Sequence, residues 1–241
     1  MPAAARPRVI RTALVVLFVA PYAVLASMVG YPVARLFRSP RLLYALGRFG
    51  ARAGLWLAGV RAVVEGAERL GQGTNTVVMS NHASHLDAAL LIALLPLDFK
   101  VVVKKELYGF PFVHNCFDYV GFIKVDRGDP EQARQAVARA VAALRAGSAF
   151  LIFPEGTRSP RGELGEFKKG GFVVAIGAGS RIVPVAVQGS AGLMPKGSFL
   201  IRPGTVRLAV LDPVDAGGYS YESRDGLIGD VRSRIAHALV G

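Results

Sequence analysis

Two short stretches of this chain, residues 149–153 and 182–187, are apolar throughout. Runs of this length are typical of strands that are buried on both faces of a parallel sheet. Around them, strand-like segments rich in β-branched residues alternate with helical patterns. This alternation favours an open sheet with helices packed on it. We therefore predict an α/β fold with a mixed, mostly parallel open sheet covered by helices.

The remaining elements follow from the same patterns. Further strands are expected at residues 61–66, 76–80, 99–103 and 120–125, and residues 198–210 predict a hairpin. Helices are expected from His85 to Pro96, from Pro130 to Gly147 after a cap at Asp129, and over residues 221–239. In such a sheet the functional loops lie at strand ends.

The domain organisation is simple. A length of 241 residues suits one α/β domain, and no low-complexity linker or internal repeat divides the chain. We predict two parts: an N-terminal segment of residues 1–58, made of two membrane-associating helices, and a main domain of residues 59–241.

The N-terminal segment contains an uncharged run of 23 residues, from 12 to 34, which exceeds the roughly 20 residues that cross a bilayer core. Arginines flank the run on both sides, so the positive-inside bias selects no orientation, and Pro21 and Pro32 lie within it. A segment that enters and leaves the same leaflet satisfies both observations. A cleaved signal peptide is the competing interpretation. The length of the run and the lack of a small-x-small cleavage site favour retention at the membrane.

Residues 41–57 follow with arginines interleaved among apolar and aromatic residues. This pattern predicts a second, amphipathic helix that lies in the membrane interface with its arginines toward lipid phosphates.

The formal net charge of +12 indicates an anionic partner, and nucleic acid, anionic lipids and phosphorylated substrates all qualify. Here basic residues flank apolar, membrane-like segments, and the chain has no RNA- or DNA-binding motif. Membrane lipids are therefore the predicted partner, and nucleic acid is not. A nucleic-acid-binding module is the alternative from another class, and a strong salt-dependent affinity for DNA would support it.

The chain has one cysteine, Cys116, which excludes an internal disulfide and a multi-cysteine metal site. It also lacks an aspartate-rich or His/Cys ligand cluster, so no metal is predicted.

The segment from Asn81 to Asp87 directly follows the strand expected at residues 76–80. It places His82 five residues ahead of Asp87. An imidazole is well matched to remove a proton from an alcohol near neutral pH, and a carboxylate behind the ring fixes its tautomer. On one continuous helix these side chains would lie roughly 140° apart, so His82 must precede the helix.

The same residues have a structural interpretation. Ser84 and Asp87 form the pattern of a capping box, in which the histidines are incidental loop residues. A second histidine, His85, adds to the ambiguity. These residues alone do not decide between a catalytic pair of His82 and Asp87 and a capping box of Ser84 and Asp87.

Three loops that follow predicted strands carry cations, namely Lys104, Arg127 and Arg158. Loops of this kind converge on one edge of an α/β sheet, where the three side chains can meet one anion. Arginine supplies a planar bidentate fork for phosphate, and lysine supplies a point charge.

The loop that contains Arg158 has further polar groups. Gly156 allows a close backbone approach to an anion, and Thr157 adds a hydroxyl donor. Glu155 accepts only, so it suits pairing with an arginine or holding a substrate hydroxyl. The alternative is a plain turn with solvated cations.

Together these segments resemble the 1-acylglycerol-3-phosphate O-acyltransferase family, the HxxxxD glycerolipid acyltransferases. Four blocks match in order: residues 81–87, 121–127, 153–159 and 183–187. The resemblance extends over roughly residues 60–210. HxxxxD alone is weak, but HxxxxD followed by FPEGTRS is strong. His85 occupies a variable position of the first block, and Lys124 and Val125 stand where many members have other residues.

The resemblance implies a glycerolipid acyltransferase-like fold and transfer of a fatty acyl group to the sn-2 hydroxyl of lysophosphatidic acid, giving phosphatidic acid. His82 would be the general base and Asp87 would orient it. Arg127, Glu155, Gly156 and Arg158 would form the glycerol-phosphate site. Two weaker substrate-binding candidates join them, Lys104 and Thr157.

The expected partners are lysophosphatidic acid, membrane lipids and either acyl-CoA or acyl carrier protein as co-substrate, with no cofactor. No covalent acyl-enzyme is expected, because the chain has no GxSxG elbow. The expected location is a membrane, with the catalytic domain on the cytoplasmic face of the inner or plasma membrane. The alternatives are another acceptor, such as glycerol-3-phosphate, another lysophospholipid or a lyso-aminolipid, and an inactive membrane scaffold.

Overall fold

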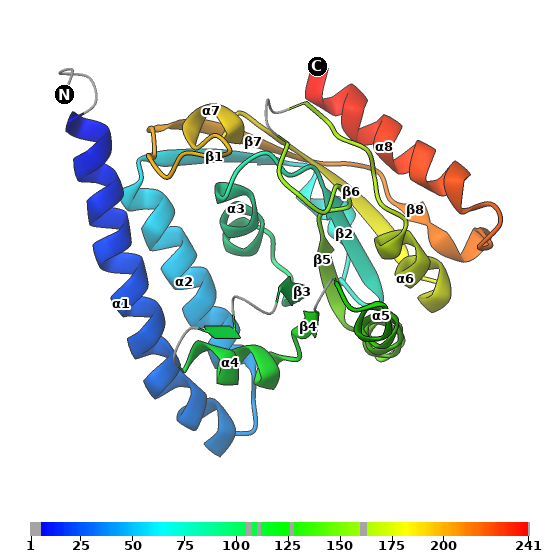
Figure 1. Cartoon of the computed structure of the whole chain (residues 1–241), viewed down its shortest axis with the longest axis horizontal. Helices are drawn as coiled ribbons and strands as arrows, with labels where there is room; N and C mark the ends of the chain where they lie inside the picture. The colour runs from blue at the N-terminus through cyan, green and yellow to red at the C-terminus, as the bar shows by residue number, and fades with distance from the viewer. Residues whose placement is uncertain (1–5, 105–107, 110–111, 126–127, 160–162, 241) are drawn as a thin grey trace.

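The computed structural model describes residues 6–104, 108–109, 112–125, 128–159 and 163–240. In these residues one mixed sheet has the strand order β1-β7-β6-β2-β5-β3-β4, with β8 paired to β6 (Figure 1). The parallel pairs are β2 with β5 and β6, β3 with β4 and β5, and β1 with β7; β6 is antiparallel to β7 and β8. This confirms the mixed, mostly parallel sheet. The strands are β1 Val60–Glu65, β2 Thr76–Ser80, β3 Phe99–Lys104, β4 Ile123–Val125, β5 Ala149–Ile152, β6 Arg181–Gln188, β7 Gly204–Val210 and β8 Val214–Asp215.

Helices cover both faces of the sheet. They are α1 Arg6–Leu36, α2 Arg41–Leu57, α3 Leu86–Leu94, α4 Val113–Val120, α5 Pro130–Arg145, α6 Gly170–Ala178, α7 Ser190–Leu193 and α8 Arg224–Val240. Helices α2 and α3 pack on one face, and α5, α6 and α8 pack on the other, while α1 lies outside α2 (Figure 1).

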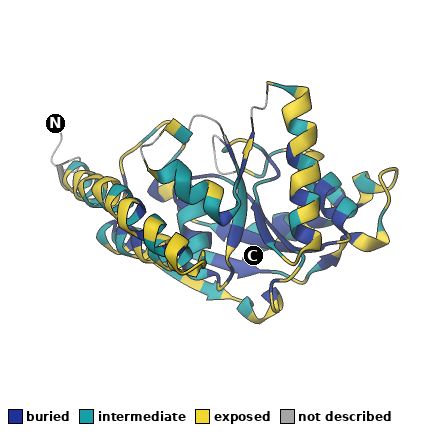
Figure 2. Ribbon diagram, turned by 90° about the horizontal axis from the view of Figure 1, so that it is seen from below, coloured by how far each residue is buried: buried dark blue, intermediate teal, exposed yellow. Residues whose placement is uncertain are grey.

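The alternation of side chains along the strands builds two cores. On β2, Val78 faces α2 and α3, whereas Val77 and Met79 face α5, α6 and α8. All three are fully buried, and the sheet occupies the buried centre of the molecule (Figure 2). The continuous apolar pattern arises because both faces of the central strands are covered.

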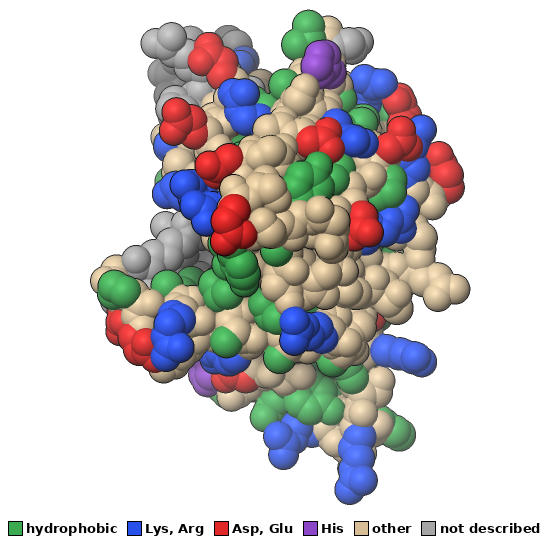
Figure 3. Space-filling view, turned by 90° about the vertical axis from the view of Figure 1, so that its right-hand side faces the viewer, with side chains coloured by type: hydrophobic (Ala, Val, Ile, Leu, Met, Phe, Trp, Pro, Cys, Tyr) green, Lys and Arg blue, Asp and Glu red, His purple; other side chains and the backbone are tan. Residues whose placement is uncertain are grey.

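The face on which α8 lies is charged with both signs. Basic and acidic side chains are interspersed there (Figure 3), and several pair with one another. Arg234 contacts Asp230 at 2.8 Å, and Arg69 contacts Asp212 at 2.8 Å. The excess positive charge of the chain is therefore not gathered on this face.

Helix α5 begins as the sequence predicts. The side chain of Asp129 accepts hydrogen bonds from the N–H groups of Glu131 and Gln132, and Pro130 is the first helical residue. Proline is tolerated there because its missing N–H would have no intrahelical partner.

The predicted hairpin at residues 198–210 is wrong. Only β7 forms, and its antiparallel neighbour is β6. The N–H groups before β7 bond elsewhere: Ile201 N–H donates to Thr12 Oγ1 at 2.9 Å and Arg202 N–H donates to the Leu193 carbonyl at 2.8 Å. Residues 198–203 thus form hydrogen bonds to α1 and to the end of α7 instead of pairing as a strand.

The strand predicted at residues 120–125 begins later, at Ile123, because helix α4 extends to Val120. Gly121 then caps α4 with a left-handed φ of 79°, and Phe122 N–H donates to the Phe117 carbonyl. This closing turn of α4 takes residues that the sequence pattern assigned to the strand.

Helices α1 and α2 form an antiparallel hairpin (Figure 1). Helix α1 continues through Pro21 and Pro32, so the chain reverses at residues 37–40 and not at the prolines. In the described part of the chain, one helix, over residues 8–36, is long and apolar enough to cross a membrane. The hairpin is close-packed: a Cβ on Gly50 would lie 2.4 Å from the Tyr22 ring, and Tyr22 Oη–H donates to the Leu46 carbonyl.

Candidate active site

His82 and Asp87 meet at the carboxyl end of β2. His82 Nδ1 lies 2.9 Å from Asp87 Oδ2, and Asp87 is fully buried. The same oxygen accepts the N–H groups of Ala83 at 2.7 Å and Ser84 at 2.8 Å. Because a carboxylate only accepts, Nδ1 of the neutral imidazole carries the proton and Nε2 keeps its lone pair. The ring is thus set up to take a proton at Nε2.

The capping interpretation also holds in part. Asp87 accepts the Ser84 N–H, as in a capping box, but Ser84 Oγ accepts from Leu86 N–H at 3.2 Å. Helix α3 begins at Leu86, one residue later than predicted. Asp87 therefore orders the start of α3 and orients His82 with the same oxygen.

The loop after β5 holds the backbone of His82 from both sides. His82 N–H donates to Glu155 Oε1 at 2.7 Å, and Ser159 N–H donates to the His82 carbonyl at 2.8 Å. The ring of Phe153 stacks on the His82 imidazole, with centroids 4.1 Å apart. Two segments separated by about seventy residues in sequence thus place a single side chain.

The loop from Asn81 to Ser84 is fixed at two further points. The Asn81 side chain donates to and accepts from the backbone of Val187, at 2.9 and 2.8 Å. Ser84 Oγ–H donates to the Met194 carbonyl at 2.8 Å. All of these groups are buried, so breaking any of them leaves an unpaired polar group away from water.

Glu155 is bound to the backbone in this structure. Its second oxygen, Oε2, accepts Gly165 N–H at 3.0 Å, so each carboxylate oxygen has a backbone donor. Burial raises the pKa of Glu155, although hydrogen bonds from His82 and Gly165 act in the opposite direction. In the described residues the Glu155 carboxylate pairs with no arginine. Its contact with a substrate hydroxyl stays a prediction.

The other predicted substrate-binding residues are only partly visible. Gly156 adopts a left-handed φ of 70°, Thr157 is exposed and Arg158 is half-buried. Lys104 ends β3 at the same edge of the sheet, but its side chain lies outside the described residues, as does all of Arg127. Arg158 lies close enough to His85 to help lower its pKa, after the larger effect of burial.

The comparison with known proteins follows from this geometry. The family model described as Acyltransferase matches residues 61–188, more than half of the chain. The chain belongs to the Acyltransferase family. The matched residues include His82, Asp87 and the whole loop of residues 153–159.

Several relatives in the Acyltransferase family carry the name 1-acyl-sn-glycerol-3-phosphate acyltransferase. One from Borreliella burgdorferi is 29% identical over 83% of this chain and 80% of its own length. The chloroplastic LPAT1 of Arabidopsis thaliana is 34% identical over 73% of this chain, which spans only 48% of that relative. The crystal structure of the 1-acyl-sn-glycerophosphate (LPA) acyltransferase PlsC from Thermotoga maritima superposes with a TM-score of 0.80 at 28% identity, over 96% of this chain and 95% of that one.

Two lysines of this Acyltransferase-family chain lie against the loop after β5, although neither belongs to a motif that the sequence showed. Lys196 Nζ donates to the Arg158 carbonyl at 2.7 Å, and the Lys168 side chain lies 3.1 Å from the position of a Cβ on Gly156. Lys196 lies in the loop between α7 and β7, for which the sequence predicted no site residue. The register of that loop is set by tertiary contacts, so no local pattern signalled the lysine.

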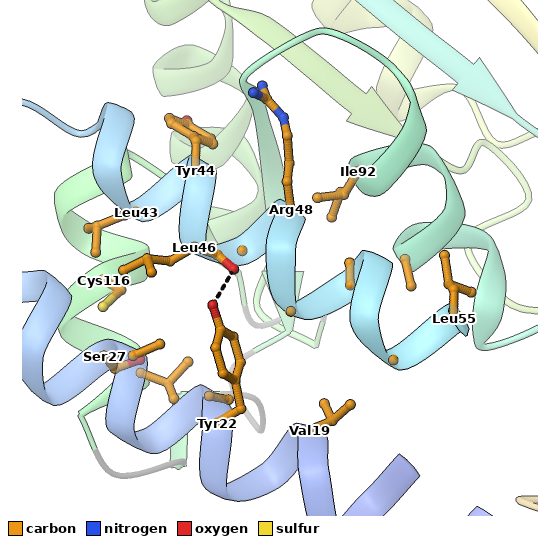
Figure 4. Close-up of a pocket in the computed structure, with 18 of the residues that line it drawn as sticks. Val19, Tyr22, Ser27, Leu43, Tyr44, Leu46, Arg48, Leu55, Ile92 and Cys116 are labelled. Atoms are coloured by element: carbon orange, nitrogen blue, oxygen red, sulfur yellow. Dashed lines mark hydrogen bonds between the residues drawn. The ribbon is translucent and has the colours of Figure 1, made fainter. Parts of the chain in front are cut away.

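An apolar cavity of about 470 Å³ lies between α1, α2, α3 and α4 (Figure 4). Figure 4 shows lining residues from α1, α2 and α3, among them Val19, Leu55 and Ile92, and the hydrogen bond from Tyr22 to the Leu46 carbonyl. Leu86, the residue before Asp87, also lines this cavity. The cavity therefore reaches the start of α3, although neither His82 nor Asp87 lines it, and its volume is typical of ligand pockets.

The two backbone bonds of Glu155 lead to a testable expectation. In Glu155→Ala, two inward N–H groups lose their acceptor, which costs about 1–3 kcal/mol for each. We expect a lower free energy of unfolding in urea. We also expect kcat to fall by about tenfold to a hundredfold, because His82 is no longer held in place.

Glu166→Ala is the matched control, since Glu166 is an exposed glutamate in the same loop region. It should change neither stability nor kcat. Glu155→Gln should fall between, because an amide can accept only one of the two N–H groups. Wild-type kcat and stability in Glu155→Ala would show that Glu155 does not place His82.

Proposed function

We propose that this chain is a membrane-bound acyltransferase that moves a fatty acyl group to the sn-2 hydroxyl of 1-acyl-sn-glycerol 3-phosphate, giving phosphatidic acid. The observation that carries the proposal is the 2.9 Å contact of His82 Nδ1 with a buried carboxylate, in a chain of the Acyltransferase family. The names of the relatives, all lysophosphatidic acid acyltransferases, support the choice of acceptor.

The reaction uses His82 as general base. Nε2 takes the proton of the acceptor hydroxyl while its oxygen attacks the thioester carbonyl carbon. The carbon–sulfur bond then breaks, and the released thiolate takes the proton from Nε2, which restores the neutral imidazole. Asp87 holds the imidazole in the required tautomer and stabilises the imidazolium that forms. Because the alcohol attacks the thioester directly, no acyl-enzyme is part of the proposal.

The apolar cavity suits an acyl chain. Its lining residues are mostly apolar, and Leu86 extends it to the start of α3, the helix that contains Asp87. We propose that an acyl chain in the cavity approaches the acyl-transfer site from this end. The donor is acyl-CoA or acyl carrier protein, with no cofactor or metal, because a thioester is already activated.

The acceptor phosphate is assigned to the cations at the same edge of the sheet. Arg158 has a buried guanidinium nitrogen without a hydrogen-bond partner in the described residues, so it is available to an anion. Gly156 and Thr157 complete this loop, and Lys104 and Arg127 are proposed to join it. Glu155 supports the site through the backbone of His82.

The membrane assignment rests on the α1–α2 hairpin. Large apolar side chains are exposed along α1, among them Leu17 at 71% and Val29 at 66%, and along α2, including Phe49 at 60% and Trp56 at 78%. Exposed apolar area of this extent is typical of a lipid-facing surface. We propose that the hairpin holds residues 59–241 on the cytoplasmic face of the inner or plasma membrane.

The assignment of the acceptor is tested with Arg158→Ala. Losing a charge-assisted hydrogen bond to phosphate costs about 1.5–3 kcal/mol, so the KM for lysophosphatidic acid should rise at least tenfold. The KM for a monoacylglycerol, which has no phosphate, should not rise. Steady-state thiol release with each acceptor gives the two KM values. Arg127→Ala is measured in the same way and should give the same result.

Arg134→Ala on α5 controls for the loss of one positive charge, because Arg134 is 77% exposed and pairs with Glu131. An unchanged KM for lysophosphatidic acid in both Arg158→Ala and Arg127→Ala would remove the phosphate-bearing acceptor. Another lipid hydroxyl would then be the substrate of the same dyad.

A further inference from the structure

A second hollow lies at the edge of the sheet opposite to His82. Its volume is about 650 Å³, and charged and polar side chains are among its lining residues. It is formed by the start of α2, the end of α4 and the segments that precede strands β2, β3 and β5, represented by Gly73, Asp98 and Ser148. We call it the amino-edge pocket, since these segments lie before the amino ends of the strands.

The amino-edge pocket is separate from the acyl-transfer site. His82 follows the carboxyl end of β2, whereas Gly73 precedes its amino end. Strand β2 has five residues, and at about 3.3 Å per residue the two sites are on the order of 15 Å apart. A ligand in this pocket does not touch the dyad.

Three cations line the amino-edge pocket against one carboxylate. Arg48 is already paired with that carboxylate, Asp98. Arg41 and Lys100 take part in no ion pair among the described residues, and the first turn of α2 contains no acidic residue. The pocket therefore holds two uncompensated positive charges, a distribution that favours a bound anion.

The position of these side chains is set by the fold. Figure 4 shows Arg48 on the side of α2 turned away from Tyr22, which is the side of the sheet. Lys100 lies over Gly121, where its Nζ would be 3.0 Å from a Cβ. Arg41 comes directly after the turn between α1 and α2.

The surroundings of the pocket indicate a lipid. Leu36 is 77% exposed and Phe37 is 73% exposed, and only Arg38 separates them from Ser39 and Pro40, which line the pocket. An apolar tip that enters a bilayer would hold a basic pocket beside it at the depth of lipid phosphates. Guanidinium and ammonium groups bind phosphate through charge-assisted hydrogen bonds.

We propose that the amino-edge pocket binds the phosphate of an anionic bilayer lipid, as a site additional to acyl transfer. Arg41 and Lys100 contact the phosphate, and Arg48 completes the positive wall. A lipid held there fixes the tip of the α1–α2 hairpin at the membrane surface. Arg48 and Tyr44 also line the apolar cavity, so the occupied pocket adjoins its outer wall.

The test is calorimetric titration of the full-length protein in a neutral detergent with dihexanoyl phosphatidylglycerol below its critical micelle concentration. Arg41→Gln/Lys100→Gln should bind at least tenfold more weakly than the wild type. Arg134→Gln/Arg145→Gln removes the same charge from α5 and should bind like the wild type. Neither measurement uses an acyl donor, so its failure is distinct from failure of the proposed acyl transfer.

The acyl-transfer site could bind the same phosphate, and Arg158→Ala separates the two. Binding lost in Arg158→Ala but retained in Arg41→Gln/Lys100→Gln would overturn the proposal. Circular dichroism shows whether each variant is folded. If the double variant is unfolded, the single variants Arg41→Gln and Lys100→Gln are tested in its place, and each is expected to bind more weakly than the wild type.

Two further ligands identify the source of the phosphate. Dihexanoyl phosphatidylcholine, which has no net charge, and glycerol 3-phosphate, which has no chains, should both bind at least tenfold more weakly than dihexanoyl phosphatidylglycerol. Equal affinity for glycerol 3-phosphate would support a phosphate site but overturn its assignment to a bilayer lipid.

Discussion

His82→Ala is expected to lower kcat for acyl transfer by about 10²- to 10⁴-fold, the usual contribution of a positioned general base. The variant should remain folded, because the backbone N–H and carbonyl of residue 82 keep their bonds to Glu155 and Ser159. The KM for both substrates should change little, since the ring acts on the reacting proton. Steady-state thiol release, together with a thermal unfolding curve, measures these quantities.

Added imidazole tests whether the lost rate of His82→Ala is due to the missing ring. Truncating His82 opens space between Phe153 and Asp87, where the ring stacks and bonds in the wild type. Added imidazole should restore part of the lost rate. His237→Ala, on α8 and away from the site, should behave like the wild type with and without imidazole. Full activity of His82→Ala would remove the histidine from the mechanism.

Asp87→Asn should lower kcat by about 10²- to 10⁴-fold, because an amide lacks the charge that stabilises the imidazolium. The fold should be kept. The amide oxygen can still accept the three N–H groups that Oδ2 accepts from His82, Ala83 and Ser84. Asp87→Ala should lose stability as well, since these donors then have no acceptor. Comparing the pair separates orientation of His82 from ordering of α3.

Asp212→Asn controls for loss of a carboxylate, because Asp212 is 75% exposed in a surface ion pair with Arg69. Its kcat and melting temperature should match those of the wild type. Should Asp87→Asn keep wild-type kcat, the carboxylate would be only a helix cap, which is the alternative that the sequence leaves open.

The central sheet could be predicted because its signal is local. The apolar runs around Leu151 and Val185 have no polar position, and both residues are buried between two layers of helices. The hairpin at 198–210 could not, because the Ile201 N–H bonds to Thr12, far away in sequence, and the Arg202 N–H bonds to Leu193 of α7 rather than to a partner strand. Propensity describes a segment, while the partner of an edge or loop depends on the whole fold.

The dyad was predictable for a different reason. Five residues separate His82 from Asp87, and a strand-to-helix turn closes that gap within one loop. The stacking of Phe153 and the anchoring of Asn81 to Val187 depend on which strands are neighbours, and the sequence alone gives no strand order. Glu155 was assigned to the substrate by its type and by the family resemblance, and this assignment stays a prediction; its two bonds to backbone N–H groups could not be read from the sequence.

The two bonds between residue 82 and the loop after β5 have a consequence for engineering. Because Glu155 and the backbone of Ser159 both bond to the backbone of His82, we expect the two loops to be exchangeable between family members only when both are exchanged together. A chimaera that takes residues 81–87 from another family member without residues 153–159 would contain a histidine whose backbone contacts come from a loop of a different protein. A redesign of acceptor choice in this chain should therefore change residues 81–87 and residues 153–159 together.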